Sequence, residues 1–350
     1  MPLPTAIELP GADPKSSSVY SFQGHSTNLQ VNSRGIAQSV YDDVDPATYL
    51  GPRGRQETVV NAQGLTLRVY YWPAEQPKAI LQFVHGHGAH ALFELLEIDV
   101  CGGEAGKPPT YAGWVAKLNA AGISVVAHDN QGCGRSEAAR GLRFYIESFD
   151  DFVKDVLLLR RELVKQEGFD SLPVFLGGIS LGGCIALTSL LEEPDQYRGL
   201  CLLAPMISLQ KVSRKGLNPY LRPLAALLSR VVPWAPIIAT DRTSNSVLQL
   251  QWDADPLTAH MNTRVRNANE YLCATERVTG RLGTLQKPFI VFHSENDTMC
   301  DADGSKQLYA EAQSDDKTIR FVNSMWHVLV KEPGNEEVLQ TLVQWILDRA

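Results

Sequence analysis

Short apolar runs alternate with helix-length segments along most of the chain, and this alternation is the sequence feature that most restricts its fold. Runs of strand character span residues 65–72, 79–84, 123–127, 173–177, 200–204, 288–293 and 318–322. Helical spacing marks residues 111–121, 150–164 and 181–191 and returns after Pro333, where Asn335 is the expected N-cap. This order predicts an α/β fold with a mostly parallel central sheet that is flanked by helices.

The alternation stops near residue 205 and resumes near residue 287. Residues 205–286 are therefore predicted to be an insertion that forms a helical cap, or lid, on an α/β core made of residues 56–204 and 287–350. Residues 1–55 are rich in Ser, Pro, Gly, Asn and Gln, with weak periodicity, so we expect an N-terminal extension that is flexible or draped over the core. A chain of 350 residues is long enough to bury one large core with these additions.

Composition excludes several classes of function. The formal net charge is -7 and no dense Lys/Arg run occurs, so nucleic acid is not expected as a partner. The first residues do not read as a secretory signal, and no run of about 18 apolar residues is present to span a bilayer. The six scattered cysteines are typical of reduced thiols, so we expect a cytoplasmic protein.

A G-x-S-x-G motif, Gly178-Ile179-Ser180-Leu181-Gly182, lies between a predicted strand and a predicted helix. In that setting the serine occupies a strained turn, which lifts its hydroxyl above the carboxyl edge of the sheet. Any side chain at Gly178 or Gly182 would collide with the neighbouring strand and helix. We therefore predict that Ser180 is a catalytic nucleophile.

A serine hydroxyl needs a base that accepts its proton, and on this kind of sheet the chain order is serine, acid, histidine. Three histidines follow Ser180 in the chain. His260 lies within the insertion and His293 ends a strand. His327 falls in a loop after the last predicted strand, from which it could reach over the sheet edge, and we predict that it is the general base.

The orienting acid should project from the loop after an intervening strand. Asp297 follows the strand at 288–293 and is the residue that we predict for this role. Its rivals are Glu295, Asp301 and Asp303, of which the last two are expected to help begin the next helix.

An oxyanion hole requires two preorganised backbone N–H groups. Leu181 directly follows the nucleophile, and His87 lies in the glycine-rich loop 85–88 after an early strand. The loss of one such donor typically costs about 3 kcal/mol of transition-state stabilisation. Because the backbone performs this role, the identity of side chain 87 is not expected to be critical.

The same loop permits a remote alternative, a metal-dependent hydrolase. The spacing His85-x-His87-x-x-His90 resembles the histidine cluster of binuclear zinc hydrolases, but Ala89 stands where those enzymes have Asp. A metal site would also leave the setting of Ser180 unexplained. We therefore expect neither a metal nor an organic cofactor.

With these residues placed, the chain resembles the monoacylglycerol lipase and lysophospholipase group of α/β-hydrolases from about Glu57 to its C-terminus. The matching motifs are the HG-x-G loop 85–88, the D-x-x-G-x-G-x-S loop within 127–137, Asp255-Pro256-Leu257, and His327-Val328-Leu329. The resemblance implies cleavage of a small lipid ester through an acyl-enzyme, with a mobile lid over an apolar acyl channel. A lysophospholipase or a broader carboxylesterase remains an alternative, whereas the intact triad argues against a non-enzymatic binding module.

The sequence departs from that group on the alcohol side of the site. Relatives that hydrolyse monoglycerides surround the glycerol with a Glu, an Arg and a His, and the matching positions here are Ala89, Phe93 and Val330. A site built to hydrogen-bond an alcohol loses discrimination when those partners are replaced by apolar groups. The acid side of the ester is therefore better supported than the alcohol side.

One segment of the insertion predicts an amphipathic helix. Its apolar residues are Leu221, Leu224, Ala225, Leu227, Leu228, Val231 and Val232, and the basic residues Lys211, Arg214, Lys215, Arg222 and Arg230 flank or interrupt it. Such a helix on a lipid hydrolase favours peripheral docking onto a membrane surface. The alternative is that its apolar face packs on the core.

Overall fold

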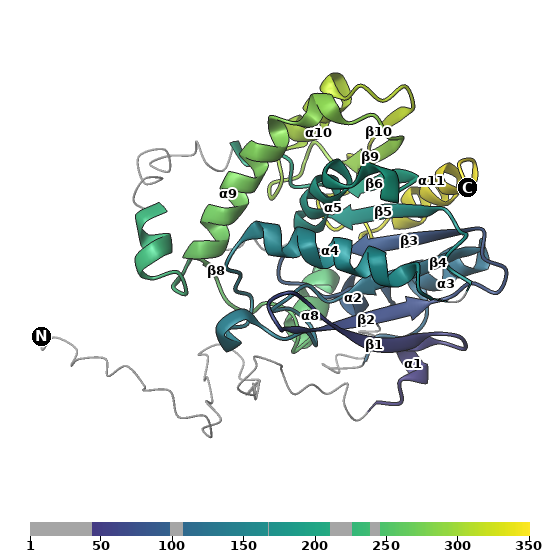
Figure 1. Ribbon diagram of the computed structural model, residues 1–350, viewed down its shortest axis with the longest axis horizontal. Helices are drawn as coiled ribbons and strands as arrows, with labels where there is room; N and C mark the ends of the chain where they lie inside the picture. The colour runs from purple at the N-terminus through teal and green to yellow at the C-terminus, as the bar shows by residue number, and fades with distance from the viewer. Residues whose placement is uncertain (1–43, 99–107, 167, 211–225, 239–245) are drawn as a thin grey trace, which may run out of the picture.

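A computed structural model describes residues 44–98, 108–166, 168–210, 226–238 and 246–350. Eight strands form one sheet (Figure 1). Their order is β1 (Arg55–Val60), β2 (Thr66–Trp72), β4 (Ile123–His128), β3 (Ala79–Val84), β5 (Val174–Ile179), β6 (Gly199–Leu203), β9 (Phe289–His293) and β10 (Lys317–Phe321). The β1–β2 and β2–β4 pairs are antiparallel, and all pairs from β4 to β10 are parallel.

The strands predicted from the sequence are confirmed within one or two residues at each end. The edge strand β1 is not predicted from the sequence, because its residues Arg55-Gln56-Glu57 are polar and only partly buried. Just before β1, the short helix α1 (Ala47–Leu50) packs against the sheet: Tyr49 is buried and its carbonyl accepts a 3.1 Å hydrogen bond from Trp72 Nε1. The ordered core therefore begins before residue 55.

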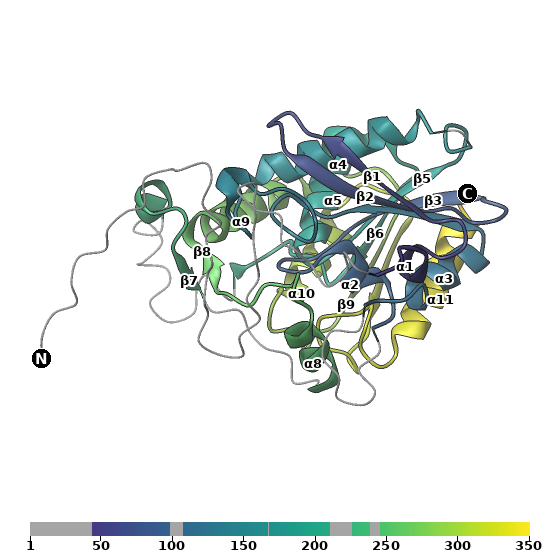
Figure 2. The same cartoon turned by 90° about the horizontal axis from the view of Figure 1, so that it is seen from below.

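Helices cover both faces of the sheet, and a separate apolar core lies under each layer (Figure 2). The first layer holds α4 (Phe149–Leu163), α5 (Leu181–Glu192) and α9 (Val265–Thr279). The second holds α2 (Ala91–Leu95), α3 (Gly113–Ala120) and α11 (Asn335–Leu347). Along β3 the side chains alternate between the two cores, with Ile80 and Val84 on the first face and Leu81 and Phe83 on the second. This alternation is what a strand buried on both faces requires.

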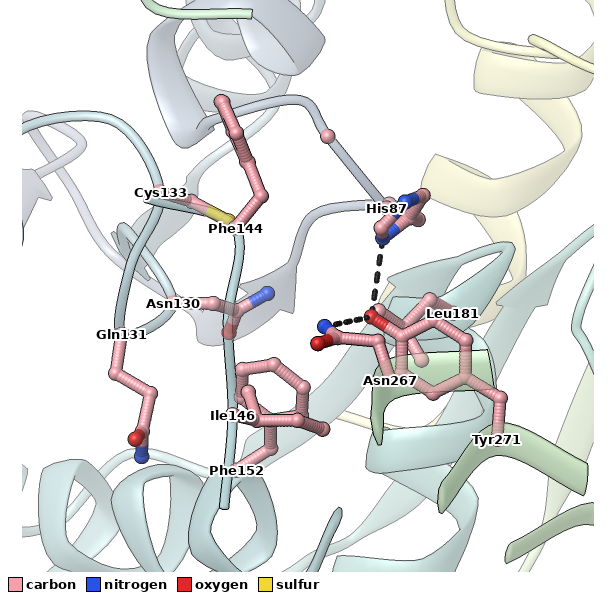
Figure 3. A pocket seen from close by; sticks show the side chains of 12 residues that line it. His87, Asn130, Gln131, Cys133, Phe144, Ile146, Phe152, Leu181, Asn267 and Tyr271 are labelled. Carbon is pink, nitrogen blue, oxygen red and sulfur yellow. Dashed lines mark hydrogen bonds between the residues drawn. The ribbon is translucent and has the colours of Figure 1, made fainter. Parts of the chain in front are cut away.

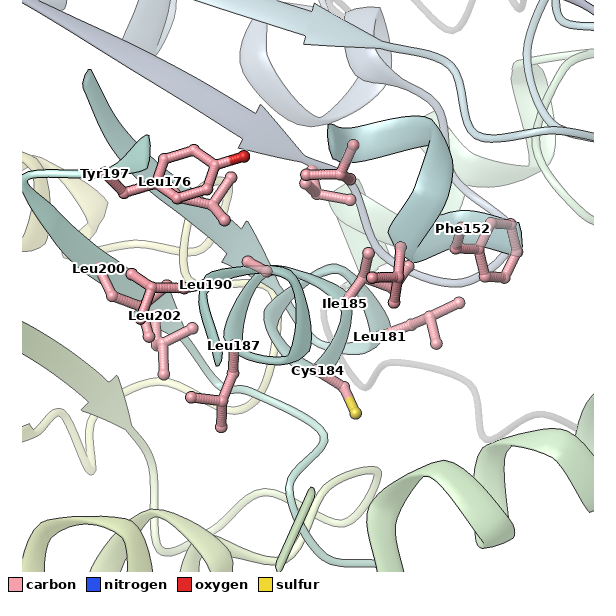
Figure 4. Close-up of a cluster of buried hydrophobic side chains, with 14 of the residues drawn as sticks. Phe152, Leu176, Leu181, Cys184, Ile185, Leu187, Leu190, Tyr197, Leu200 and Leu202 are labelled. Atoms are coloured by element: carbon pink, nitrogen blue, oxygen red, sulfur yellow. The ribbon is translucent and has the colours of Figure 1, made fainter. Parts of the chain in front are cut away.

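The helix that follows the G-x-S-x-G motif lies in the middle of the first core. Nine of its twelve residues are buried, including Leu181, Cys184 and Ile185, and Figure 4 shows Leu187 and Leu190 of this helix beside Leu202 of the sheet. A helix that is apolar on all sides is stable only when it is enclosed by other elements. The position of the G-x-S-x-G turn is consequently held by the core itself.

Other helical segments in the described ranges are α10 (Ala302–Glu311) and the short 3-10 turns η2 (Ala139–Gly141), η3 (Pro194–Gln196) and η4 (Leu282–Thr284). Asp301 is the N-cap residue of α10 and Asp303 lies in its first turn, as predicted. The predicted N-cap of α11 is wrong by one residue. Gly334, with φ of 99°, holds that position, and Asn335 instead accepts a hydrogen bond from Trp114 Nε1 at 3.0 Å.

Between β6 and β9 the chain forms β7 (Pro236–Ile238), α8 (Ser246–Ala254), β8 (Thr263–Arg264) and α9. Figure 1 shows β8 and the start of α9 on the left, beyond the carboxyl ends of the parallel strands, and Figure 2 shows β7 beside β8. Of the predicted amphipathic helix, residues 226–231 are helical, whereas Leu221, Leu224, Ala225 and the basic residues 211–222 lie outside the described residues.

None of the helices within the described ranges combines the length and the apolar character needed to cross a lipid bilayer. The five cysteines in these ranges are free thiols, and all except Cys273 are buried.

Candidate active site

Ser180 occupies a strained turn between β5 and α5. Its φ of 54° and ψ of -122° lie in a region that non-glycine residues rarely adopt. A Cβ at Gly178 would come 2.3 Å from the carbonyl oxygen of Gly182, and a Cβ at Gly182 would come 2.1 Å from that of Val84. The predicted reason for both glycines is therefore confirmed.

The side chain of Asp297 is buried directly after β9 and is surrounded by donors. Its Oδ1 accepts hydrogen bonds from the N–H groups of Met299 at 2.7 Å and Cys300 at 3.0 Å, and its Oδ2 lies 2.7 Å from His327 Nδ1. Burial would raise the pKa of this carboxyl. The charge of His327 and hydrogen bonds from His293, His327 and the Cys300 N–H outweigh burial and lower the pKa well below its usual value.

His327 lies in the loop after β10, and a buried carboxylate that was not predicted shapes this loop. The carboxylate of Glu332 accepts hydrogen bonds from the backbone N–H groups of Trp326, His327 and Val328, at 2.5, 2.9 and 2.6 Å. Three donors on one carboxylate fix the backbone on both sides of the imidazole. The sequence signal for this role is the Lys331-Glu332 pair that follows His327.

A second histidine touches the same aspartate. His293, which the sequence places only at the end of a strand, has its Nε2 3.2 Å from Asp297 Oδ2 and its Nδ1 2.7 Å from Ser305 Oγ. Both the His293 and the Asp297 side chains are fully buried. Asp297 is therefore held between two imidazoles, and only His327 faces the site.

The other acidic candidates lie elsewhere. Asp301 accepts a 3.2 Å hydrogen bond from Ser208 Oγ, and Asp303 is exposed. Glu295 is exposed and pairs with Lys306 at 2.6 Å. Asp297, by contrast, contacts His327 directly.

Ser180 lies close to this acid–base pair, with Cys300 between them. Within the described residues, the hydrogen-bond partner of Ser180 Oγ is Cys300 Sγ at 3.8 Å, and the Cys300 N–H in turn donates to Asp297. No hydrogen bond joins Ser180 to His327 there; such bonds are often long before substrate binds. Burial raises the pKa of the Cys300 thiol, so this cysteine is a neutral neighbour of the serine.

The two predicted oxyanion donors belong to elements that meet at Ser180. Leu181 is the first residue of α5, and the first N–H groups of a helix have no partner within it. The loop 85–88 lies against the same turn, since a Cβ built on Gly86 would be 3.5 Å from Ser180 Cβ. Both N–H groups are thus near the serine.

The side chain of His87 has partners that the sequence did not indicate. Its Nδ1 lies 3.0 Å from Tyr271 Oη and its Nε2 lies 3.0 Å from Thr263 Oγ1. Figure 3 shows His87 and Tyr271 beside a small cavity between the loop and α9. The cavity is lined by residues 86–88, Asn130, Gln131, Cys133, Phe144, Ile146, Phe152, Leu181, Asn267 and Tyr271.

The three histidines of the remote metal alternative do not converge. His85 contacts the Gly86 carbonyl and accepts from the Asn130 N–H, and the ring of His90 contacts Asp255. In the ranges that the structure describes, no group of three or more His, Cys, Asp or Glu side chains is arranged to hold a metal ion. These imidazoles are engaged in hydrogen bonds to the protein, as is that of His87.

The three apolar departures are buried beside the loop. Ala89 and Phe93 form a cluster with side chains from α8 and from the segment before residue 99, and Val330 is buried in the second core. Phe93 stacks edge-on against Trp252, with ring centroids 5.4 Å apart. All three positions therefore hold apolar side chains that are packed against other apolar groups.

Glu94 is a buried carboxylate near the site that the sequence did not single out. Its Oε1 accepts a 3.4 Å hydrogen bond from the Gly86 N–H, and within the described residues its Oε2 has no partner. Burial raises the pKa of Glu94, although the charges of Lys331 and His327 oppose this. Lys331 is itself partly buried and donates to the Leu96 carbonyl, and desolvation of its amine lowers its pKa to about 8.

A sheet of this strand order, with a strained serine between strand and helix and an Asp–His pair at the ends of later strands, defines an α/β-hydrolase. The family model described as serine aminopeptidase, S33, matches residues 100–334. The monoglyceride lipase of Rattus norvegicus is 31% identical over 300 residues, which cover 83% of this chain and 90% of that protein.

Solved structures agree on the fold. The monoacylglycerol lipase of Paleococcus ferrophilus has a TM-score of 0.66 at 21% identity, with 81% of this chain and 99% of that one covered. A soluble variant of the Saccharomyces cerevisiae monoglyceride lipase, in complex with a substrate analog, has a TM-score of 0.68 at 18% identity, with 87% and 98% covered. The chain belongs to the serine aminopeptidase S33 family, and it is a serine ester hydrolase of the monoacylglycerol lipase type.

Proposed function

We propose that the enzyme releases fatty acids from monoacylglycerols, with Ser180 as nucleophile, His327 as general base and Asp297 as the orienting acid. The observation that carries this proposal is the 2.7 Å contact between His327 Nδ1 and Asp297 Oδ2, which lies beside the strained turn of Ser180. The similarity to monoglyceride lipases over most of the chain supports the substrate class.

In the proposed reaction, His327 Nε2 takes the proton of Ser180 as Oγ bonds to the ester carbonyl carbon. The N–H groups of His87 and Leu181 stabilise the resulting oxyanion. His327 then gives the proton to the departing alcohol, and the acyl group stays on Ser180. Water attacks this ester in the same way and releases the fatty acid, while Asp297 keeps Nδ1 of His327 protonated throughout.

The test is fatty-acid release from parallel panels of monoacylglycerols, lysophospholipids and short-chain esters. Ser180→Ala should abolish turnover, and Ser189→Ala is the matched control because its buried hydroxyl only donates to the Ile185 carbonyl one helical turn away. Normal turnover by Ser180→Ala would overturn the assignment of the nucleophile.

The residues expected around the alcohol of the ester support a second candidate function, a lysophospholipase or broader carboxylesterase. Ala89, Phe93 and Val330 are all buried apolar residues, so they offer no hydrogen bond to glycerol. Preference for lysophospholipid or short esters over monoacylglycerol in the same panels would favour this candidate. Ser180-dependent preference for monoacylglycerol would reject it.

We also propose that the enzyme is a cytoplasmic protein that collects its substrate at a membrane surface through the insertion. Leu227, Val231 and Trp234 are 57%, 61% and 45% exposed, whereas Ser229 between them is buried. An exposed apolar edge beside the exposed Arg230 suits an interface with anionic lipid.

Sedimentation with vesicles of phosphatidylcholine and phosphatidylserine tests this contact. The double variant Leu227→Ser and Val231→Ser should lose most of its bound fraction and keep its activity on a short soluble ester. Val60→Ser is the control, because Val60 is equally exposed, at 62%, on the edge strand β1. Equal binding by all three proteins would refute membrane contact through this segment.

A further inference from the structure

His87 carries a predicted oxyanion donor on its backbone, yet its side chain is bonded to the insertion. The ring lies between Thr263 of β8 and Tyr271 of α9, at 3.0 Å from each hydroxyl. It also meets the Tyr271 ring edge-on, with centroids 5.4 Å apart. Asn267 Nδ2 in turn donates to Tyr271 Oη at 3.1 Å, as the dashed lines in Figure 3 show.

The hydrogens of this network can be placed by chemistry. Burial lowers the pKa of His87 to about 4, so at neutral pH the imidazole has one donor and one acceptor. Burial raises the pKa of Tyr271 well above its usual value, so the phenol keeps its proton. Because Asn267 donates to Tyr271, the phenol donates to His87 Nδ1, and Nε2–H donates to Thr263. The bonds therefore run in one direction, from Asn267 to Thr263.

Other contacts tie the same loop to the insertion. The Ala259 N–H donates to the Gly88 carbonyl at 2.8 Å, and His90 Nε2 lies 2.9 Å from Asp255 Oδ2 in a fully enclosed pair. A Cβ on Gly88 would come 2.7 Å from Ala259 Cβ, so the two backbones are in close contact. Residues 255–271 thus supply a partner to each of positions 87, 88 and 90.

We propose that His87 is a positioning residue through which the insertion sets the direction of the oxyanion-hole N–H. Residue 87 lies between Gly86 and Gly88, and Gly88 has φ of 73°, so glycine leaves the backbone on both sides free to rotate. The bonded imidazole removes this freedom. An oxyanion donor acts only within 2.7–3.1 Å of the developing charge, so a small rotation of the peptide weakens it.

This inference rests on the proposed function, because it assumes that the N–H of His87 faces the oxyanion. It adds that the insertion contributes to the chemical step and does not merely cover the site. Loss of the network should therefore lower kcat, while KM for a short soluble ester changes little.

The experiment is a double-mutant cycle on His87 and Tyr271. His87→Ala should lower kcat about 10-fold or more, but by no more than the roughly 10²–10³-fold loss of a complete donor, with less than about a twofold change in KM. Tyr271→Phe keeps the ring and removes only the hydroxyl, and it should lower kcat severalfold. In the His87→Ala background, Tyr271→Phe should have no further effect, because its partner is gone.

Thr275→Val on α9 is the matched control, since that hydroxyl donates only to the Leu272 carbonyl, and it should leave kcat unchanged. Melting temperatures of all variants distinguish loss of folding from a change in the direction of the residue 87 N–H in a folded protein. Wild-type kcat in folded His87→Ala, or independent losses from the two substitutions, would overturn the inference while Ser180-dependent activity stands. Full activity of Ser180→Ala would instead overturn the proposed function.

Discussion

Replacement of Asp297 by asparagine tests the proposed site most directly. Oδ1 of Asp297 is fixed by the N–H groups of Met299 and Cys300, so the asparagine carbonyl oxygen must take that position. The amide nitrogen then faces His327 Nδ1 at about 2.7 Å, with two hydrogens to donate. His327 can accept one of them only if Nδ1 loses its own proton.

The consequence is the wrong tautomer at the reacting nitrogen. With Nδ1 unprotonated, the proton moves to Nε2, which can no longer accept the proton of Ser180. We expect kcat to fall about 10⁴-fold, equivalent to about 5 kcal/mol in activation free energy, with little change in KM. Pre-steady-state and steady-state release of the alcohol from a chromogenic ester would measure this.

Asp303→Asn is the matched control, because Asp303 is an exposed residue in the first turn of α10. It should retain wild-type kcat. A loss of less than about tenfold in Asp297→Asn, together with a large loss in Glu295→Gln or Asp301→Asn, would refute the assignment of the acid.

Asp297→Asn should also differ from the wild type in how its stability depends on pH. The folded-state pKa of Asp297 is below its unfolded value of about 3.9, so its ionised form stabilises the fold above that pH, and this contribution disappears as the pH falls toward the folded pKa. Urea unfolding should therefore show a wild-type advantage over Asp297→Asn at pH 7 that shrinks below about pH 4. An advantage that does not depend on pH would contradict this account.

Three further outcomes are expected. Gly182→Ala should destabilise the protein by about 1–3 kcal/mol or more, because its Cβ would meet the Val84 carbonyl at 2.1 Å; an unchanged melting temperature would contradict this. Glu94→Gln keeps an acceptor for the Gly86 N–H and removes the carboxyl group, whose pKa is raised by burial. Wild type should thus lose stability relative to this variant as the pH rises above about 4.3, and parallel unfolding curves from pH 4 to 7 would refute it. Glu332→Ala removes the acceptor of three N–H groups around His327 and should lower kcat at least tenfold; normal kcat in the folded variant would show that the loop holds without it.

The sequence identified the strands, the strained serine and the Asp–His pair because each has a local cause. Strand composition reflects burial on both faces of the sheet, and the two glycines around Ser180 reflect close approach of neighbouring backbones. The chain order of serine, acid and histidine follows from the order of the strands that carry them. The match to the family model and the similarity to monoglyceride lipases confirm the expected membership of the monoacylglycerol lipase group.

The second layer of contacts could not be predicted in the same way. His293, Glu332 and Glu94 act on the site through polar contacts with residues that strand pairing or loop packing brings near them. A buried carboxylate or imidazole has no periodic signal, and its partner can be a backbone N–H that any residue type supplies. Only the packed chain shows which of these groups touch.

The contrast is sharpest at position 87. The sequence by itself determined that a glycine-rich loop follows β3 and can offer a backbone N–H to the oxyanion. It predicted no role for the identity of this side chain, because Thr263 and Tyr271 are more than 170 residues away along the chain. Tertiary structure alone decides that the insertion returns over the loop and binds this imidazole, since hydrogen bonds act over about 3 Å in space and are indifferent to distance in the chain.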